Sequence, residues 1–213
     1  MAIKKHVKQV PEEAAERPVR DRILSAAFST FTERGFAEAS TLEIATRARA
    51  SKRELYALFG NKQDVLIACI TERARRLLLP VDLPELRDRE TLRKTLAGFG
   101  ARLVGEVSEP AVVAMFRLAI AEAARTPDIA QALNDIAIAA SRDALREIMH
   151  RARSAGLLSG EPAEMAAQFF GLLWGNLMLG LLLGIAERPP RREIDRRAEA
   201  ATAAFLRAYP EPA

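Results

Sequence analysis

The stretch between Ser40 and Leu66 limits the possible folds more than any other part of the 213-residue chain, because three helix starts follow one another in it. Each start pairs a short polar residue with an acidic residue three positions later. The pairs are Ser40 with Glu43, Ser51 with Glu54, and Asn61 with Asp64. In such a pair the polar side chain accepts a hydrogen bond from a free N–H group of the first turn, and the acid can return one. We therefore expect helices over about 42–49 and 52–59, and a further helix from Lys62.

The first two of these helices are short and closely spaced. Apolar residues recur at helical intervals in both, for example Ile44 in the first and Leu55 and Phe59 in the second. Gly60 then suits the left-handed end of the second helix. A very short link between two short helices forces them to cross steeply, which is the helix-turn-helix arrangement, and the N-terminal residues of the second helix then project outward.

Cations and a tyrosine hydroxyl cluster near the N-terminal ends of these helices. Free N–H groups and the positive end of the helix dipole already favour an anion there, so the pattern is typical of phosphate recognition. Arginine or lysine at the tip of the second helix could also reach O6 and N7 of guanine in the major groove. A solvated basic face is the alternative interpretation. The residues concerned are Arg47, Arg49, Lys52, Arg53, Tyr56 and Lys62.

The net charge of +4 is unevenly distributed. Residues 1–62 contain 12 Lys and Arg against 8 Asp and Glu, whereas residues 63–213 contain 20 of each sign. A positive excess confined to one end of the chain indicates a polyanionic partner for that end.

The segments TLEIATRA, SKRELYALF and NKQDVL, read in this order, resemble the N-terminal DNA-binding domain of the TetR/AcrR family of bacterial transcriptional regulators. The resemblance covers about residues 22–70. It implies an all-helical homodimer with a helix-turn-helix in each N-terminal domain and a C-terminal domain that binds a small effector and releases operator DNA. By position, Thr41, Tyr56 and Lys62 would contact phosphates, and Lys52 and Arg53 would read bases. Ser51 is a further candidate DNA-binding residue.

Two residues depart from the family pattern. Arg49 stands in the turn where the family usually has glycine, and a left-handed conformation costs arginine more than glycine. Glu54 stands on the second helix where the family usually has a small residue. It either caps the helix or reads the N4 amine of cytosine, and we favour the cap.

The rest of the chain also predicts helices, because no segment alternates apolar and polar residues as a strand would. We expect an all-α fold of about nine helices. A flexible arm of residues 1–17 precedes a DNA-binding domain of residues 18–66 and a C-terminal domain of residues 67–213. Besides the two short helices, the expected ranges are about 18–35, 62–79, 89–107, 110–124, 126–153, 162–186 and 191–208.

Residues 165–186 carry no charge and are long enough, as one helix, to cross a bilayer core of roughly 30 Å. A membrane-associated helical protein is therefore the alternative to a regulator. A helix buried on all sides in a dimer would have the same composition, and we prefer this interpretation. With the last helix it would form a four-helix bundle between two subunits. The expected interface residues are Gly175, Leu179, Gly180, Ala198, Ala201 and Phe205.

Aromatic and methionine side chains in the C-terminal part could line an effector pocket, although such a stripe is more often ordinary core. These residues are Phe116, Phe169, Phe170, Trp174 and Met178. A small apolar or amphipathic ligand would suit them.

Enzymatic groups are scarce. The only histidines are His6 and His150, so neither a Ser-His-Asp triad nor a histidine metal site is expected, and we expect no cofactor. The single cysteine, Cys69, excludes an internal disulfide and fits a reducing cytoplasm; it is better explained as core filler than as a redox sensor. The sequence therefore predicts a cytoplasmic repressor that binds a palindromic operator as a homodimer and is released by a small effector. An activator or an architectural DNA-binding protein is a third possibility.

Overall fold

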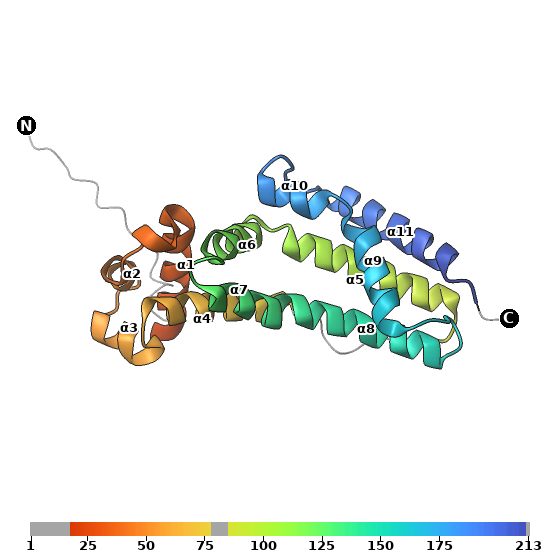
Figure 1. The fold of residues 1–213 in the computed structure, drawn as a ribbon, viewed down its shortest axis with the longest axis horizontal. Helices are drawn as coiled ribbons and strands as arrows, with labels where there is room; N and C mark the ends of the chain where they lie inside the picture. The colour runs from red at the N-terminus through yellow and green to blue at the C-terminus, as the bar shows by residue number, and fades with distance from the viewer. Residues whose placement is uncertain (1–17, 78–84, 212–213) are drawn as a thin grey trace, which may run out of the picture. The chain divides into compact units, whose positions relative to one another are not determined.

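The computed structural model describes residues 18–77 and 85–211, and all regular structure in these residues is helical. These residues form eleven α-helices and one π-helical turn, so the predicted all-α class is confirmed (Figure 1). Chain contacts divide the protein into two units, residues 1–69 and 70–213. The expected N-terminal arm lies outside the described residues.

The first unit holds α1 (Val19–Glu38), α2 (Thr41–Arg47), α3 (Lys52–Phe59) and the first half of α4 (Lys62–Leu77). Gly35 interrupts α1 with a φ of +78°, which is where the sequence predicted its end. Ile23, Ala27 and Phe31 of α1 are buried beneath the other helices. Both α2 and α3 contact α1, so the two short helices rest on a common support.

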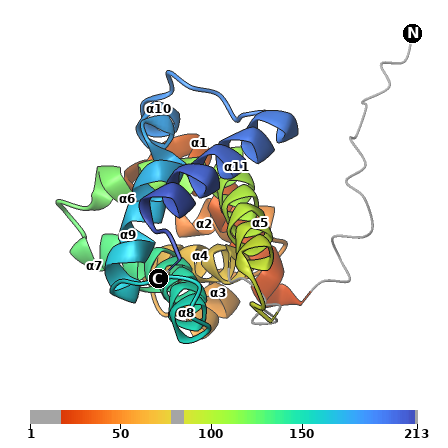
Figure 2. The same cartoon turned by 90° about the vertical axis from the view of Figure 1, so that its right-hand side faces the viewer.

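The second unit is built from α5 (Arg89–Val107), α6 (Pro110–Glu122), α7 (Pro127–Leu133), η2 (Asn134–Ile138), α8 (Ala139–Ser154), α9 (Pro162–Trp174), α10 (Leu177–Leu183) and α11 (Arg191–Ala208). Helix α5 packs against α8 and α11, while α9 packs against α8 and α11 from the other side. Figure 2 shows these four helices surrounding a shared core. Phe169 and Phe205 meet at its centre, with their rings 5.6 Å apart and edge to face.

Two expected helices are divided in the structure. The helix expected over 126–153 contains the π-helical turn η2 between α7 and α8. The apolar helix expected over 162–186 is two helices, α9 and α10, bent by 56°. No single helix among the described residues is long and apolar enough to cross a membrane; only this bent pair meets the length and composition required.

Gly175 and Arg197 hold the bend between α9 and α10. Gly175 adopts φ +47° and ψ −123°, a conformation that side chains rarely allow. Arg197 of α11 donates to the carbonyls of Leu173 and Trp174, at 3.2 and 3.3 Å, which are free at the end of α9. Arg117 of α6 similarly donates to two carbonyls at the end of α10.

The structure corrects several of the predicted interface residues. Ala198, Ala201 and Phe205 of α11 are buried in the core of their own unit, because α11 turns this face toward α5 and α9. Gly180 is also buried, and a Cβ there would meet that of Ala186 at 2.9 Å. Its close backbone approach is therefore used within the chain. Of the predicted set, only Gly175 and Leu179 are exposed.

Candidate functional site

The three predicted caps at the start of α2, α3 and α4 are confirmed. Ser40 Oγ accepts from Glu43 N–H at 3.1 Å, and Asn61 Oδ1 accepts from Asp64 N–H at 2.9 Å. At α3 the cap is reciprocal, since Ser51 Oγ accepts from Glu54 N–H while Glu54 Oε2 accepts from Ser51 N–H at 2.7 Å. These caps fix where each helix begins and hence which side chains of α3 point outward.

Glu54 has the capping role that we favoured. Hydrogen bonds from the Ser51 backbone and hydroxyl lower the pKa of the Glu54 carboxyl, and the charge of Arg22 adds to this. The carboxylate is therefore occupied by the start of its own helix. This capping geometry explains why glutamate stands at position 54 without any contact to cytosine.

The turn between α2 and α3 is tight although it lacks glycine. Arg49 takes the left-handed conformation with φ +52°, the only non-glycine residue among those described with a positive φ. Its N–H donates to the Thr46 carbonyl, and Ala50 N–H donates to the Ala45 carbonyl at 2.9 Å. This is the hydrogen-bond pattern of a Schellman end, which normally uses glycine at the left-handed position. The Arg22 guanidinium reaches the Arg49 carbonyl at 3.4 Å.

Almost the whole surface of helix α3 is exposed to solvent. Of its eight residues only Leu55 is buried, and Leu58 remains 48% exposed. A helix this short gains little stability by itself, so its caps and the Leu55 anchor hold it. In Figure 1, α2 is seen nearly end-on and α3 lies across the view, which is the steep crossing expected of a helix-turn-helix.

Three of the candidate cations are available for a partner. Arg49, Lys52 and Arg53 are exposed and make no ion pair with any residue that the structure describes. Lys52 only approaches the ring of Tyr56, with Nζ 5.8 Å from its centre. Tyr56 OH is 3.0 Å from Thr41 Oγ1, so a hydroxyl from each of the two short helices meets at one point.

The other two candidate cations, Arg47 and Lys62, have partners inside the first unit. Arg47 forms ion pairs with Glu33 at 2.7 Å and Glu43 at 2.9 Å, and the hydrogen bond that Arg47 donates to Glu33 is the largest contribution that raises the pKa of Arg47. The spacing of Glu43 and Arg47 could have suggested this pair, but the contact with Glu33 depends on the fold.

Lys62, at the start of α4, binds the carbonyls at and just after the end of α1. Its ammonium group donates to the carbonyls of Phe36, Ala37 and Ala39 at 2.7, 3.2 and 3.0 Å, and lies 4.5 Å from the centre of the Phe36 ring. An ammonium has three protons, and all three are used here. Sequence reasoning missed this role, since the carbonyls lie 23 to 26 positions away.

A second site lies inside the C-terminal unit. A cavity of about 240 Å³ is lined by four of the five predicted pocket residues: Phe116, Phe170, Trp174 and Met178. Phe169 is not among them, because it is fully buried in the core against Phe205. Sequence reasoning missed the remaining lining residues, which come from α5, η2 and α8. They are Leu103, Val107, Ile138, Ser141 and Arg142.

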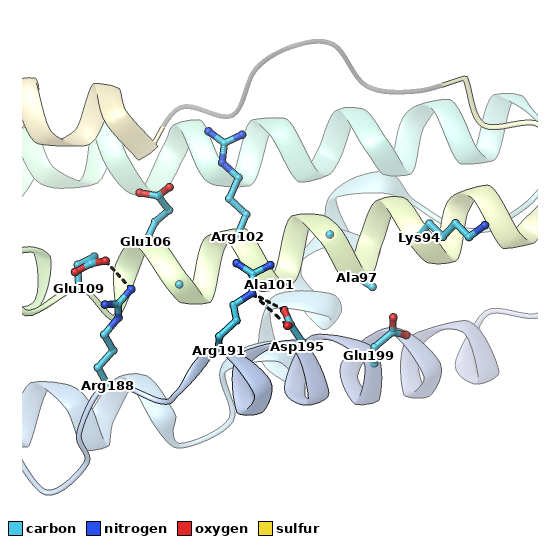
Figure 3. A pocket seen from close by; sticks show the side chains of 12 residues that line it. Lys94, Ala97, Ala101, Arg102, Glu106, Glu109, Arg188, Arg191, Asp195 and Glu199 are labelled. Carbon is cyan, nitrogen blue, oxygen red and sulfur yellow. Dashed lines mark hydrogen bonds and ion pairs between the residues drawn. The ribbon is translucent and has the colours of Figure 1, made fainter.

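A larger groove of about 610 Å³ is open to solvent between α5 and α11. Figure 3 shows its basic and acidic side chains interspersed, with Arg188 paired to Glu109 and Arg191 to Asp195. Its floor is made of small residues such as Ala97 and Ala101. Mixed and partly paired charges give this groove no preference for a ligand of either sign. No group of three or more metal-ligating side chains occurs in the described parts of the chain.

Known proteins match both units. Residues 23–69 match the model of the tetR family of bacterial regulatory proteins, and residues 94–211 match the C-terminal domain of AefR-like transcriptional repressors. An uncharacterized HTH-type transcriptional regulator of Mycobacterium tuberculosis is 24% identical over 176 residues, which cover 83% of this chain and 81% of the relative.

Solved structures share the whole fold. The flavonoid-responsive regulator FrrA is 29% identical with a TM-score of 0.76, and the match covers 91% of this chain and 97% of that one. A TetR transcriptional regulator from Agrobacterium tumefaciens is 26% identical with a TM-score of 0.78, covering 91% and 94%. Such regulators bind operator DNA, usually act as homodimers with small-molecule effectors, and are generally not enzymes. The chain thus belongs to the TetR family of bacterial regulatory proteins and is a DNA-binding transcriptional regulator of the repressor type.

Proposed function

We propose that α3 enters the major groove of operator DNA with its N-terminal end, where Lys52 and Arg53 read bases. The observation that carries this proposal is a capped eight-residue helix with one buried residue and two cations at its tip that have no ion-pair partner among the described residues. Arginine and lysine at such a tip match the acceptors of guanine. Thr41, Ser51, Tyr56 and Arg49 flank the tip and would contact phosphates.

Arg47 and Lys62 have a smaller part in this proposal than the sequence suggested. Each would have to give up contacts within its own unit before it could neutralise a phosphate. We therefore assign both a mainly structural role at the DNA-binding unit.

We further propose that two copies associate through the outer face of α9 and α10. Three large apolar side chains are exposed on these helices and a fourth lies just after α10: Leu172, Leu179, Leu183 and Ile185, with exposed fractions from 44% to 81%. Large apolar side chains exposed close together in the sequence are typical of a protein interface. A two-fold dimer places two recognition helices on a palindromic operator.

The 240 Å³ cavity is the proposed effector site, because seven of its nine lining residues are aromatic or apolar. The flavonoid-responsive neighbour supports a small, partly apolar effector. Release of DNA requires that the effector bind one of two conformations better than the other. Because such a regulator acts where the chromosome lies, we place the protein in the cytoplasm.

Selection of bound sequences from random double-stranded DNA tests the proposal. We expect an enriched palindrome whose half-sites lie about one helical turn, roughly 34–36 Å, apart or a multiple of it. If no sequence is enriched and the affinity for DNA depends only on the salt concentration, the protein does not recognise a specific operator. By reciprocity, an effector that releases the operator must bind the DNA complex more weakly by the same factor.

A further inference from the structure

We propose that the effector cavity selects anionic aromatic ligands, such as carboxylates of one or two rings, and that Arg142 binds their anionic group. This inference rests on the proposed role of the cavity as the effector site. It goes further because it assigns the ligand a charge and assigns one residue to recognise that charge.

The walls of the cavity suit a flat ring. Phe116, Phe170, Trp174 and Met178 supply aromatic faces and a polarisable sulfur, which make favourable contacts with aromatic groups. Phe170 is held by an edge-to-face contact with Phe99, whose ring centre is 6.5 Å away. A wall fixed in this way can bind a planar ligand without being reordered.

The charge at the cavity has one sign. Arg142 is the only charged residue among those that line it, and no carboxylate does so. The neighbouring acids are otherwise engaged: Asp143 pairs with Arg146 at 3.2 Å, and Asp135 accepts from Gln131 at 2.7 Å. Within the described chain Arg142 itself has no ion-pair partner. A planar guanidinium beside an apolar cavity matches a carboxylate, which it can bind with two parallel hydrogen bonds.

Helical spacing aims this group at the cavity. Ser141 and Arg142 lie three and four positions after Ile138, so both share a face with it along α8 and its preceding π-helical turn. Arg142 is exposed and therefore lies at the mouth of the cavity, whereas the aromatic residues Phe116, Phe170 and Trp174 are buried or half-buried. A ligand with an apolar ring and a terminal anion would satisfy both regions at once.

The size of the cavity limits the ligand. A dry cavity of about 150 Å³ holds benzene in a well-studied case. The cavity of about 240 Å³ thus has room for one ring with a short side chain, or for two fused rings.

Matched ligand pairs test the charge preference. The probes are 3-phenylpropanoate with 3-phenylpropanamide and 2-naphthoate with 2-naphthamide, since the members of each pair differ in charge but hardly in shape. Binding to the full-length protein is measured by calorimetry. Trp174 is the only tryptophan of the chain and lines the cavity. Quenching of its fluorescence by 3-phenylpropanoate or 3-phenylpropanamide therefore reports whether the probe enters the cavity. The variants are Arg142→Met and Arg142→Lys, and Arg146→Met is the control because it removes the same charge one turn away.

We expect the wild type to bind the carboxylates at least about tenfold more tightly than the amides, as a charge-assisted hydrogen bond allows. Arg142→Met should abolish this ratio, Arg142→Lys should retain part of it, and Arg146→Met should leave it unchanged. Equal binding of acids and amides, or a preference that survives in Arg142→Met, would overturn the inference while the effector cavity stands. Failure of every probe to bind would overturn both the inference and the proposed cavity.

Discussion

At the scale of single residues, Arg49 shows how much strain the helix-turn-helix accepts. An L-residue in the left-handed conformation loses roughly 1 kcal/mol relative to glycine, yet the turn keeps both Schellman hydrogen bonds. The arginine side chain itself points to solvent without an ion-pair partner in the described chain. Its place beside α3 suggests that DNA contact, and not stability, explains why arginine stands there.

Arg49→Gly should therefore stabilise the protein by about 0.5–1 kcal/mol, because glycine adopts a φ of +52° without strain. Urea denaturation of the full-length protein measures this as a higher midpoint with an unchanged slope. Arg53→Gly is the matched control, since Arg53 lies in α3 and glycine there should lower stability. A lower midpoint for Arg49→Gly would show that the arginine side chain supports the turn.

Lys62, which the sequence suggested as a phosphate contact, has a structural role in the protein. We expect Lys62→Met to destabilise the protein by about 1–2 kcal/mol, because three carbonyls at and just after the end of α1 lose a charged donor. Lys52→Met, which removes an exposed lysine, should leave stability unchanged and weaken operator binding instead. Thermal unfolding and operator titrations on both variants separate the roles. An unchanged unfolding temperature for Lys62→Met, with weaker binding to all DNA sequences, would restore Lys62 as a phosphate contact.

The residue scale also shows what the sequence could predict. Caps depend on residues three positions apart, so Ser40, Ser51 and Asn61 could all be assigned from spacing alone. The partners of Lys62 and the contact of Arg47 with Glu33 could not, because they join residues 14 to 26 positions apart. Likewise Phe169 and Phe170 are adjacent in sequence, and only packing decides which one enters the core.

At the scale of elements, most helix limits could be predicted because proline, glycine and polar caps mark them. The ranges 52–59, 89–107 and 191–208 agree with α3, α5 and α11. The π-helical turn and the bend after α9 could not be foreseen. Apolar periodicity continues through Trp174, and the bend is held by Arg197, which reaches it from α11.

The bend between α9 and α10 depends on Gly175. We predict that Gly175→Ala destabilises the second unit by about 1–3 kcal/mol, because a Cβ disfavours φ +47° with ψ −123°. Gly98→Ala is the matched control, since Gly98 lies in the interior of α5 with open space where a Cβ would be added. That change should instead stabilise by about 0.5–1 kcal/mol. Equal midpoints for Gly175→Ala and the wild type in urea titrations would mean that the Arg197 hydrogen bonds alone hold the bend.

At the scale of the whole molecule, the proposed dimer face consists of apolar side chains that the protomer leaves exposed. Leu179→Arg should split the dimer at micromolar concentration, because a charge would have to be buried in an apolar interface. Ile120→Arg provides the control, since Ile120 on α6 is as exposed, at 58% against 59% for Leu179, but lies outside the proposed face. Sedimentation equilibrium measures both. Dimers of equal strength in the two variants would place the interface elsewhere.

The central claim is that α3 reads operator DNA through Lys52 and Arg53. Its most direct test is a fluorescence anisotropy titration of the selected operator with the wild type, Lys52→Ala, Arg53→Ala and Arg207→Ala, the last being an exposed arginine of α11. We predict a loss of about 1–3 kcal/mol of binding free energy for each α3 variant, together with relaxed preference at one operator position, and no comparable loss for Arg207→Ala. Wild-type affinity and specificity in both α3 variants would contradict the account.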